Sequence, residues 1–215
     1  MKKVITIFGA FYFLLIFVGC SGDKKQQEVK IGDQTWMSSN LNVDKFMNGD
    51  PIPELKTEQD WKDADKNKTP GFSYYRNNVE NGKTYGKLYN WYAVNDSRGI
   101  APAGWHVPSK ADWKKLIDFL GGEETAGKKI KSSAGWTQEE GGINGTNESG
   151  FNALPGGYCT LGYFFNLNEY SGTWWTSSEH SEIFAFTYEL KYDKDKLTLL
   201  EGGKGNGFSV RCIKD

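Results

Sequence analysis

The clearest pattern of apolar and polar positions is an extended segment that leads directly into a helix. Pro108 favours extended geometry for the residue before it, and Ser109 with Asp112 has the capping-box arrangement found where helices begin. The apolar residues after this start recur at i, i+3, i+4 and i+7, which places them on one helix face: Trp113, Leu116, Ile117 and Leu120. The pattern predicts a structural helix that ends at Gly121.

Similar signals predict elements on both sides of this helix. Residues 29–37 contain two short extended runs around a Gly-Asp turn, which favours a hairpin, and Thr57 with Asp60 can cap a short helix. A second helix is expected over residues 123–131. Residues 86–94 are rich in aromatic side chains, and their periodicity fits a helix or a strand equally well.

The last third of the chain is predicted to form strands after a long loop. Residues 132–150 are rich in Gly, Ser, Asn and Thr, and loops of that length in compact domains are often functional or mobile. Strand-like runs then follow at 151–158, 162–165, 173–177, 183–190, 196–200 and 208–213. In the final run Phe208, Val210 and Cys212 fall on one face, which predicts a half-buried strand.

The N-terminal segment indicates export from the cytoplasm. Lys2 and Lys3 precede an apolar run from Val4 to Val18, which is too short for a transmembrane helix and is typical of a secretion signal. The run ends in Phe17-Val18-Gly19-Cys20-Ser21, which resembles the lipobox of bacterial lipoproteins. That resemblance implies that Cys20 receives the lipid and becomes the mature N-terminus, although Phe17 stands where leucine is usual. An ordinary cleaved signal with a chance cysteine is the alternative.

These observations divide the chain into a lipoprotein signal peptide at 1–19, a lipidated flexible tether at 20–28 and one domain at 29–215. The charged residues balance, with 26 basic and 27 acidic side chains, so the chain lacks the basic surface expected of a nucleic-acid-binding protein. Its 8 Trp, 11 Tyr, 13 Phe and 26 Gly indicate a loop-rich fold held together by aromatic anchors.

Few residues suggest chemistry. Cys159 and Cys212 would both lie outside the cytoplasm, where a disulfide can form, and two free buried thiols are an equal alternative. His106 stands alone in an apolar stretch, which favours a packed, hydrogen-bonded histidine over a metal ligand or a base. Neither cysteine has a His-Asp partner pattern nearby. We expect no catalytic residue, no metal site, no cofactor and no enzymatic activity.

Two aromatic residues are candidate ligand contacts. Exposed Trp and Tyr rings can stack on the apolar C–H faces of sugars, and Trp136 and Tyr163 lie outside the family-like blocks described below. Burial in the core is the alternative for both rings. Asn144, Asn147 and Glu148 carry oxygen atoms that suit a hard cation, but a solvated loop is the stronger expectation because the ligand spacing of a dedicated site is missing.

Several sequence blocks resemble the Fibrobacter succinogenes major paralogous domain, which is found in lipoproteins and secreted proteins of Fibrobacter and Bacteroidetes-type bacteria. They occur in family order from about Val29 to the C-terminus: Gly32-Asp33-Gln34-Thr35-Trp36-Met37, Gly49-Asp50-Pro51-Ile52-Pro53, Gly86-Lys87-Leu88-Tyr89-Asn90-Trp91-Tyr92-Ala93, Pro102-Ala103-Gly104-Trp105-His106-Val107-Pro108-Ser109, Leu154-Pro155-Gly156-Gly157, Trp174-Trp175-Thr176-Ser177-Ser178 and Gly207-Phe208-Ser209-Val210-Arg211-Cys212-Ile213.

A more distant similarity links the same blocks to C-type lectin-like folds. It implies an α+β architecture in which two helices lie beside small antiparallel sheets with long irregular loops, and in which the N- and C-terminal strands close against each other. The formylglycine-generating enzymes share that shape, but their active cysteines have no counterpart at matching positions. The Glu-Pro-Asn and Gln-Pro-Asp motifs of calcium-dependent sugar binding are also missing, and Val94-Asn95-Asp96 is only a superficial echo of the late Trp-Asn-Asp motif.

The sequence and its resemblances lead to one functional hypothesis. We expect a lipoprotein of the cell envelope, anchored at the outer membrane through Cys20, whose domain binds a partner without catalysis. Adhesion or polysaccharide binding is the favoured role, with an envelope or host protein as another partner. The alternatives are a structural, protein-binding component of a surface assembly and a hydrolase with an unrecognised site. Fold resemblance alone does not decide among them.

Overall fold

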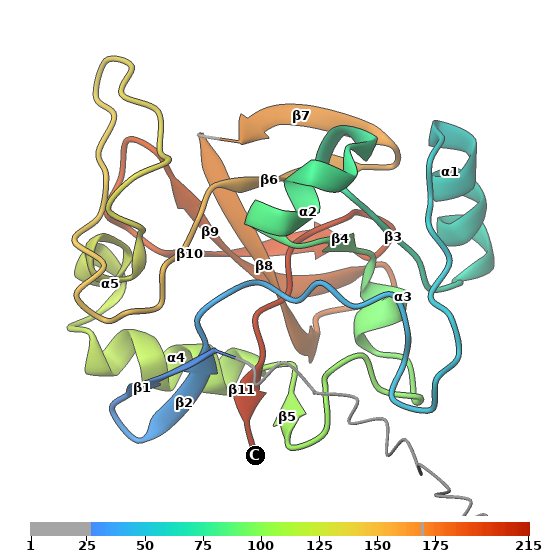
Figure 1. Ribbon diagram of the computed structural model, residues 1–215, viewed down its shortest axis with the longest axis horizontal. Coiled ribbons are helices and arrows are strands. Elements are labelled where there is room, and N and C mark those ends of the chain that lie inside the picture. The colour runs from blue at the N-terminus through green and yellow to red at the C-terminus, as the bar shows by residue number, and fades with distance from the viewer. Residues whose placement is uncertain (1–26, 169) are drawn as a thin grey trace, which may run out of the picture.

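Helices and strands are mixed along the chain in the computed structural model, which describes residues 27–168 and 170–215 (Figure 1). The predicted signal peptide and Cys20 therefore lie outside the described residues. The helices are α1 (Glu58–Asn67), α2 (Val79–Tyr85), α3 (Trp91–Val94), α4 (Lys110–Phe119) and α5 (Glu123–Ile130), with one 3-10 turn, η1 (Tyr75–Asn77). Within the described ranges, no helix is both long and apolar enough to cross a membrane. The α+β class predicted from the sequence is confirmed.

The strands form three sheets. The first contains, in spatial order, β1 (Glu28–Ile31), β2 (Gln34–Met37), β11 (Ile213–Lys214) and β5 (Trp105–His106). The second contains β10 (Thr198–Gly203), β9 (Phe184–Lys191), β8 (Ser171–Glu179), β6 (Gly156–Thr160) and β7 (Tyr163–Asn168). The third pairs β3 (Phe72–Ser73) with β4 (Leu88–Tyr89). All pairs are antiparallel except β6 with β8.

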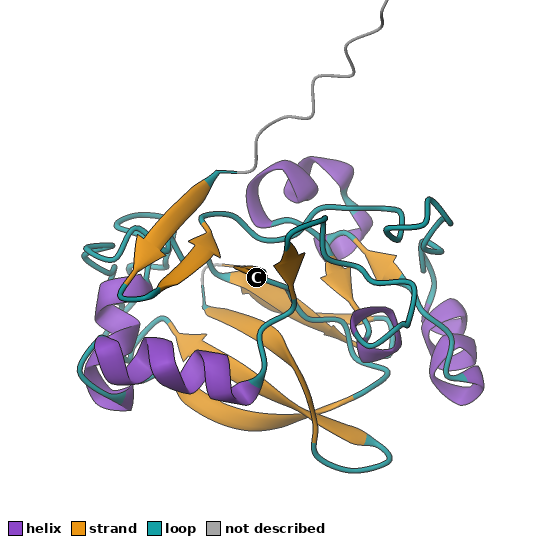
Figure 2. Cartoon of the chain, turned by 90° about the horizontal axis from the view of Figure 1, so that it is seen from below, coloured by secondary structure: helices purple, strands orange, loops and turns teal. Residues whose placement is uncertain are grey.

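The two ends of the domain lie side by side, as expected. Ile213 pairs with Trp36 of β2 on one side and with His106 of β5 on the other. Seen from below, the C-terminus lies near the centre of this face, between the β1–β2 hairpin and β5 (Figure 2).

Local sequence signals determine where two of the helices begin. Thr57 and Asp60 form a reciprocal capping box at the start of α1, and Ser109 and Asp112 form one at the start of α4. Each box satisfies backbone N–H groups that have no partner within the helix. The apolar stripe of α4 faces the core, where Trp113 lies 5.1 Å from the Trp36 ring and 5.2 Å from the Tyr188 ring.

The structure corrects two expectations. More helices are present than the two implied by the distant resemblance, because α1, α2 and α3 precede the pair formed by α4 and α5. The run at 208–213 is also not a half-buried strand. Ser209 and Arg211 are each 1 % exposed, so both faces of this segment are buried, and only Ile213–Lys214 is assigned to a strand. The segment instead makes isolated bridges, Tyr89 with Phe208 and Trp174 with Ser209.

The C-terminal segment is held by a buried guanidinium group. Arg211 donates through Nε and Nη2 to Oδ1 of Asn40, at 3.0 and 2.7 Å, and through Nη1 to the carbonyl oxygens of Met37 and Phe151. The same Asn40 oxygen accepts from the Trp174 indole at 2.9 Å. Burial lowers the pKa of Arg211 to about 9, so the group remains a cation at neutral pH. Hydrogen bonds from every arm of the guanidinium compensate its desolvation.

Replacing Arg211 tests how much its buried cation stabilises the folded state. Arg211→Met leaves the carbonyl oxygens of Met37 and Phe151 without their buried donor, so we expect the free energy of unfolding to fall by about 3 kcal/mol. Lys214→Met, three residues on, removes an exposed ion pair with Glu28 and a contact of the ammonium group with the partly exposed Trp105 ring, and should cost less than about 1 kcal/mol. Urea unfolding monitored by tryptophan fluorescence measures both. Equal losses in the two variants would contradict this assignment.

Candidate functional site

Trp136 lies in the core and is not available as a stacking platform. Its side chain is 3 % exposed, and its indole N–H donates to Ser132 Oγ and to the Ala153 carbonyl, each at 3.1 Å. A buried ring has no free face for a sugar, so the predicted ligand contact at Trp136 is corrected. The burial of Trp136 could not be predicted from its irregular, polar loop, because it arises only when the loop folds back onto the end of α5.

Lys131 explains how the loop is fixed. Its side chain is fully buried, its Nζ donates to the carbonyl oxygens of Lys194 (2.6 Å), Tyr192 (3.2 Å) and Ile143 (3.4 Å), and it lies 4.7 Å from the Trp136 ring centre. A Cβ atom on Gly145 would come within 2.2 Å of the Lys131 carbonyl oxygen, so the loop backbone packs directly against the end of α5. The ammonium group therefore joins the 132–150 loop to the turn after β9.

Tyr163 is exposed and remains a predicted ligand contact. Its side chain is 55 % exposed at the start of β7, and its hydroxyl hydrogen-bonds Glu58, which raises the pKa of Tyr163. Glu58 also pairs with Lys62 one turn along α1. An accessible ring beside a fixed carboxylate and an ammonium group offers the apolar and polar features that saccharide recognition requires.

Cys159 and Cys212 are free thiols in this structure. Both are buried, and they belong to different hydrophobic clusters, Cys159 with Trp61 and Leu88, and Cys212 with Met37 and Val210. Burial raises the pKa of each thiol to about 12. Protonated, inaccessible thiols are poor nucleophiles. The structure corresponds to the alternative of two free buried cysteines.

His106 differs from the packed histidine that was expected. It is exposed at the edge of the first sheet, with Nδ1 2.7 Å from Asp215 Oδ1 and Nε2 3.8 Å from Asp112 Oδ2. The Asp112 carboxylate is already engaged in capping α4. Two further carboxylates lie at the surface with partners, Glu179 with Lys204 and Glu182 with Lys68.

The loop oxygens considered for a hard cation have partners within the protein. Asn144 Oδ1 accepts from the Trp136 backbone N–H at 3.3 Å, Asn147 Oδ1 accepts from the Asn152 N–H at 2.7 Å, and Glu148 pairs with Lys129 at 3.4 Å. Across the described ranges, His, Cys, Asp and Glu side chains form no group of three that suits a metal ion. The loop therefore uses its polar groups to hold its own shape.

A groove lies between α4, the start of α5 and the β9–β10 pair. It has a volume of about 420 Å³, and its lining includes Leu199 and the buried Tyr188, which are direct cross-strand partners. Ala111 and Ile117 complete the apolar wall. A set of charged side chains surrounds this apolar centre: Lys110, Lys114, Asp118 and Glu123.

The polar rim of this groove, hereafter the α4 groove, is held by local contacts. Lys114 Nζ pairs with both carboxylate oxygens of Asp118, at 2.7 and 2.8 Å, and Lys110 Nζ lies 4.1 Å from the Phe186 ring centre. Burial, together with the negative charges of Glu123 and Asp118, raises the pKa of Tyr188 to about 12. The groove thus combines an apolar floor with fixed hydrogen-bonding groups of both signs, which suits an uncharged, amphipathic ligand such as a sugar ring.

Sequence reasoning did not identify the α4 groove. It predicted the buried face of α4 correctly, but Lys110, Ala111, Lys114 and Asp118 lie on the flank of the helix, and nothing in their spacing indicates which strand lies opposite. The opposite side of the groove comes from β9 (184–191) and β10. The pairing of these two strands is a feature of the tertiary structure, which the local sequence does not show.

Comparison with known proteins gives one match. A family profile described as the Fibrobacter succinogenes major domain matches residues 29–214, which is nearly the whole described chain. No curated protein and no solved structure matches the sequence.

The buried lysine makes a prediction about pH. Burial lowers the pKa of Lys131 to about 8 from 10.5, against the opposing effect of Asp195 and Asp193. Between those values the unfolded chain holds a proton that the folded chain has released, so this group makes the free energy of unfolding rise with pH. We expect a rise of roughly 3 kcal/mol from pH 8 to pH 10.5 relative to Lys131→Met. Chemical denaturation of both proteins across this range checks it, and parallel curves would refute the shift.

Proposed function

The chain belongs to the Fibrobacter succinogenes major domain family, and from that premise we propose that it is a lipid-anchored cell-envelope protein whose domain binds saccharide. The proposal has three parts: an anchor at Cys20, a C-type lectin-like scaffold and a binding site in the α4 groove. Each part has its own support in the sequence or in the geometry.

The anchor is supported by the N-terminal sequence. A short basic segment, an apolar run and the Phe17-to-Ser21 lipobox resemblance occur in the order that lipoprotein processing requires. We propose that Cys20 carries the lipid and that the protein is held at the outer membrane. The first strand begins at Glu28, so only a short tether separates the lipid from the domain.

The C-type lectin-like scaffold is supported by the arrangement of the ends and of the central helices. β11 lies between β2 and β5, and α4 and α5 follow β5 directly. A long irregular loop at 132–150 then leads into the late antiparallel strands β8, β9 and β10. The three additional helices before β5 are elaborations that the distant resemblance did not include.

The α4 groove is the observation that carries the saccharide proposal. Sugars present apolar C–H faces and a perimeter of hydroxyl groups, and the groove presents the accessible apolar surface of Ala111 and Leu199 beside ammonium and carboxylate groups, while the Tyr188 ring itself is buried in the core. Because the charges balance, with two lysines against Asp118 and Glu123, the groove favours a neutral polysaccharide over a strongly anionic one.

A non-catalytic role is part of the proposal. Of the groove's two carboxylates, Asp118 is paired with Lys114 at the exposed surface, which gives no positive support for the acid/base pair of glycoside hydrolysis. The buried thiols and the surface position of His106 give no positive support for nucleophilic chemistry. Adhesion to polysaccharide at the cell surface is the role that fits these features.

Filling the groove tests the binding proposal. Ala111 is exposed on α4 and lines the groove, so Ala111→Phe places a ring in the site without disturbing the core. We expect saturable binding of the mature chain to at least one neutral polysaccharide in a panel, and a loss of 10-fold or more in Ala111→Phe. Ala134→Phe, at an exposed alanine of the 132–150 loop, is the matched control and should bind normally. Binding that survives in Ala111→Phe would exclude this groove.

The anchor has a separate test. Cells expressing the chain are fed a clickable fatty acid, and we expect label on the wild-type protein and none on Cys20→Ala. Cys159→Ala removes a buried cysteine instead and should keep the label. Wild-type protein should also sediment with the membrane fraction. Label that persists in Cys20→Ala would overturn the lipoprotein assignment.

A further inference from the structure

Trp105 is an exception among the tryptophans of this protein. Of the 8 Trp in the sequence, 7 are buried, and Trp105 alone is partly exposed. It occupies β5, at the edge of the first sheet, where its backbone pairs with Lys214. The partly exposed indole thus belongs to a strand that lies beside the C-terminal strand β11.

An apolar surface adjoins this indole. Two neighbouring hollows of about 340 and 240 Å³ share Met47, Ile100 and Ala101, and Trp105 lines the larger one. Met47 is 62 % exposed between them, although such a long apolar side chain usually gains from burial. We call the area formed by Val43, Met47, Ile100, Ala101, Pro102 and Trp105 the Met47–Trp105 surface.

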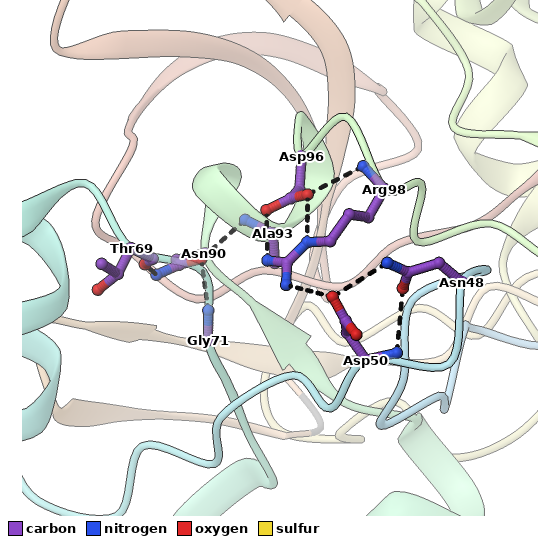
Figure 3. A network of polar contacts seen from close by, with 8 residues as sticks. All are labelled: Asn48, Asp50, Thr69, Gly71, Asn90, Ala93, Asp96 and Arg98. Carbon is purple, nitrogen blue, oxygen red and sulfur yellow. Dashed lines mark hydrogen bonds and ion pairs between the residues drawn. The ribbon is translucent and has the colours of Figure 1, made fainter.

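The loop that presents Met47 is rigidly held. The Met47 backbone N–H donates to the Gly99 carbonyl at 2.9 Å. Figure 3 shows Arg98 joining the two loops, with its guanidinium paired to Asp96 at 2.8 Å and to Asp50 at 3.1 Å. The same guanidinium lies 4.0 Å from the Phe46 ring centre. The exposure of Met47 is thus built into the fold by contacts on both sides of the residue.

The start of the domain lies beside this surface. Lys214 Nζ pairs with Glu28 Oε2 at 2.9 Å and lies 5.7 Å from the Trp105 ring centre. Glu28 begins β1, and the segment from Cys20 to Gln27 is 8 residues long, which spans at most about 28 Å when fully extended. A lipid on Cys20 would therefore hold the Met47–Trp105 surface within reach of the bilayer.

From these observations we propose that the Met47–Trp105 surface docks on the phospholipid bilayer that carries the anchor. The inference rests on the proposed lipid at Cys20. Trp favours the boundary between headgroups and acyl chains, and an apolar patch next to an acyl anchor adds a second membrane contact to the first. Docking fixes the orientation of a domain that its tether alone would leave free.

The charges around the surface indicate which kind of bilayer suits it. Lys45 lines the smaller hollow, Lys214 is paired with Glu28, and Arg98 is neutralised by its two carboxylate partners. Insertion of apolar side chains, and not attraction to anionic lipids, therefore drives the contact. It should depend little on salt and should occur on zwitterionic phosphatidylcholine.

The experiment uses the lipid-modified mature chain reconstituted into phosphatidylcholine vesicles with or without brominated acyl chains, which quench tryptophans that enter the bilayer. Flotation first reports whether the chain is anchored. We expect brominated lipid to reduce the fluorescence of the wild-type protein, and this loss to disappear in Trp105→Phe. Met47→Glu, at an exposed position, should diminish the quenching, whereas Ile183→Glu, at a 63 % exposed residue in the β8–β9 turn, should not.

The outcomes separate the two proposals. Protein that floats with the vesicles but shows equal quenching in wild type and Trp105→Phe would overturn docking and leave the anchor intact. Failure to float would overturn the anchor and docking with it. A third outcome would also count against this surface: Ile183→Glu reduces the quenching as strongly as Met47→Glu does. The reduction would then result from an added charge at any position on the domain.

Discussion

The buried guanidinium of Arg211 is the constraint on which the fold depends. Burying a charge without a compensating ion costs several kcal/mol unless its donors are satisfied. Here the acceptors come from two distant segments, one with Met37 and Asn40 and the other with Phe151, so the cation is stable only when both are assembled. Because Trp174 shares the same Asn40 oxygen, the site also connects the first sheet to the second.

The same solution recurs at buried lysines, of which Lys131 and Lys204 are two. Lys131 lies 4.7 Å from the Trp136 ring centre and Lys204 lies 4.6 Å from that of Trp91, while Arg211 lies 4.4 Å from that of Phe151. Aromatic faces and backbone carbonyls stabilise these cations in the interior. Many of the aromatic side chains thus pack in an irregular core and contact its buried cations. This explains why so few aromatic rings remain at the surface for ligands.

The two proposed contacts of this domain therefore use the few apolar areas that the core leaves open. The α4 groove and the Met47–Trp105 surface share no lining residue, so a domain docked through one can keep the other available. Tyr163, beside α1, is a third accessible aromatic position. Together, the proposed tether, docked face and groove would make this a protein that presents a binding site at a fixed orientation to the membrane.

The sequence by itself determined the local structure of this protein and its family. Capping boxes at Thr57 and Ser109, the apolar stripe of α4 and the late strands depend on neighbours a few residues away, so they could be predicted. Tertiary structure decided which individual polar and aromatic side chains are buried and which are exposed. Trp136 is buried because its loop packs against the end of α5, where Lys131 hydrogen-bonds backbone carbonyl groups. Ser209 and Arg211 are buried because the C-terminal segment passes between two sheets. The α4 groove likewise exists only because β9 and β10 lie against a helix flank that is distant in sequence, and no local pattern records such a contact.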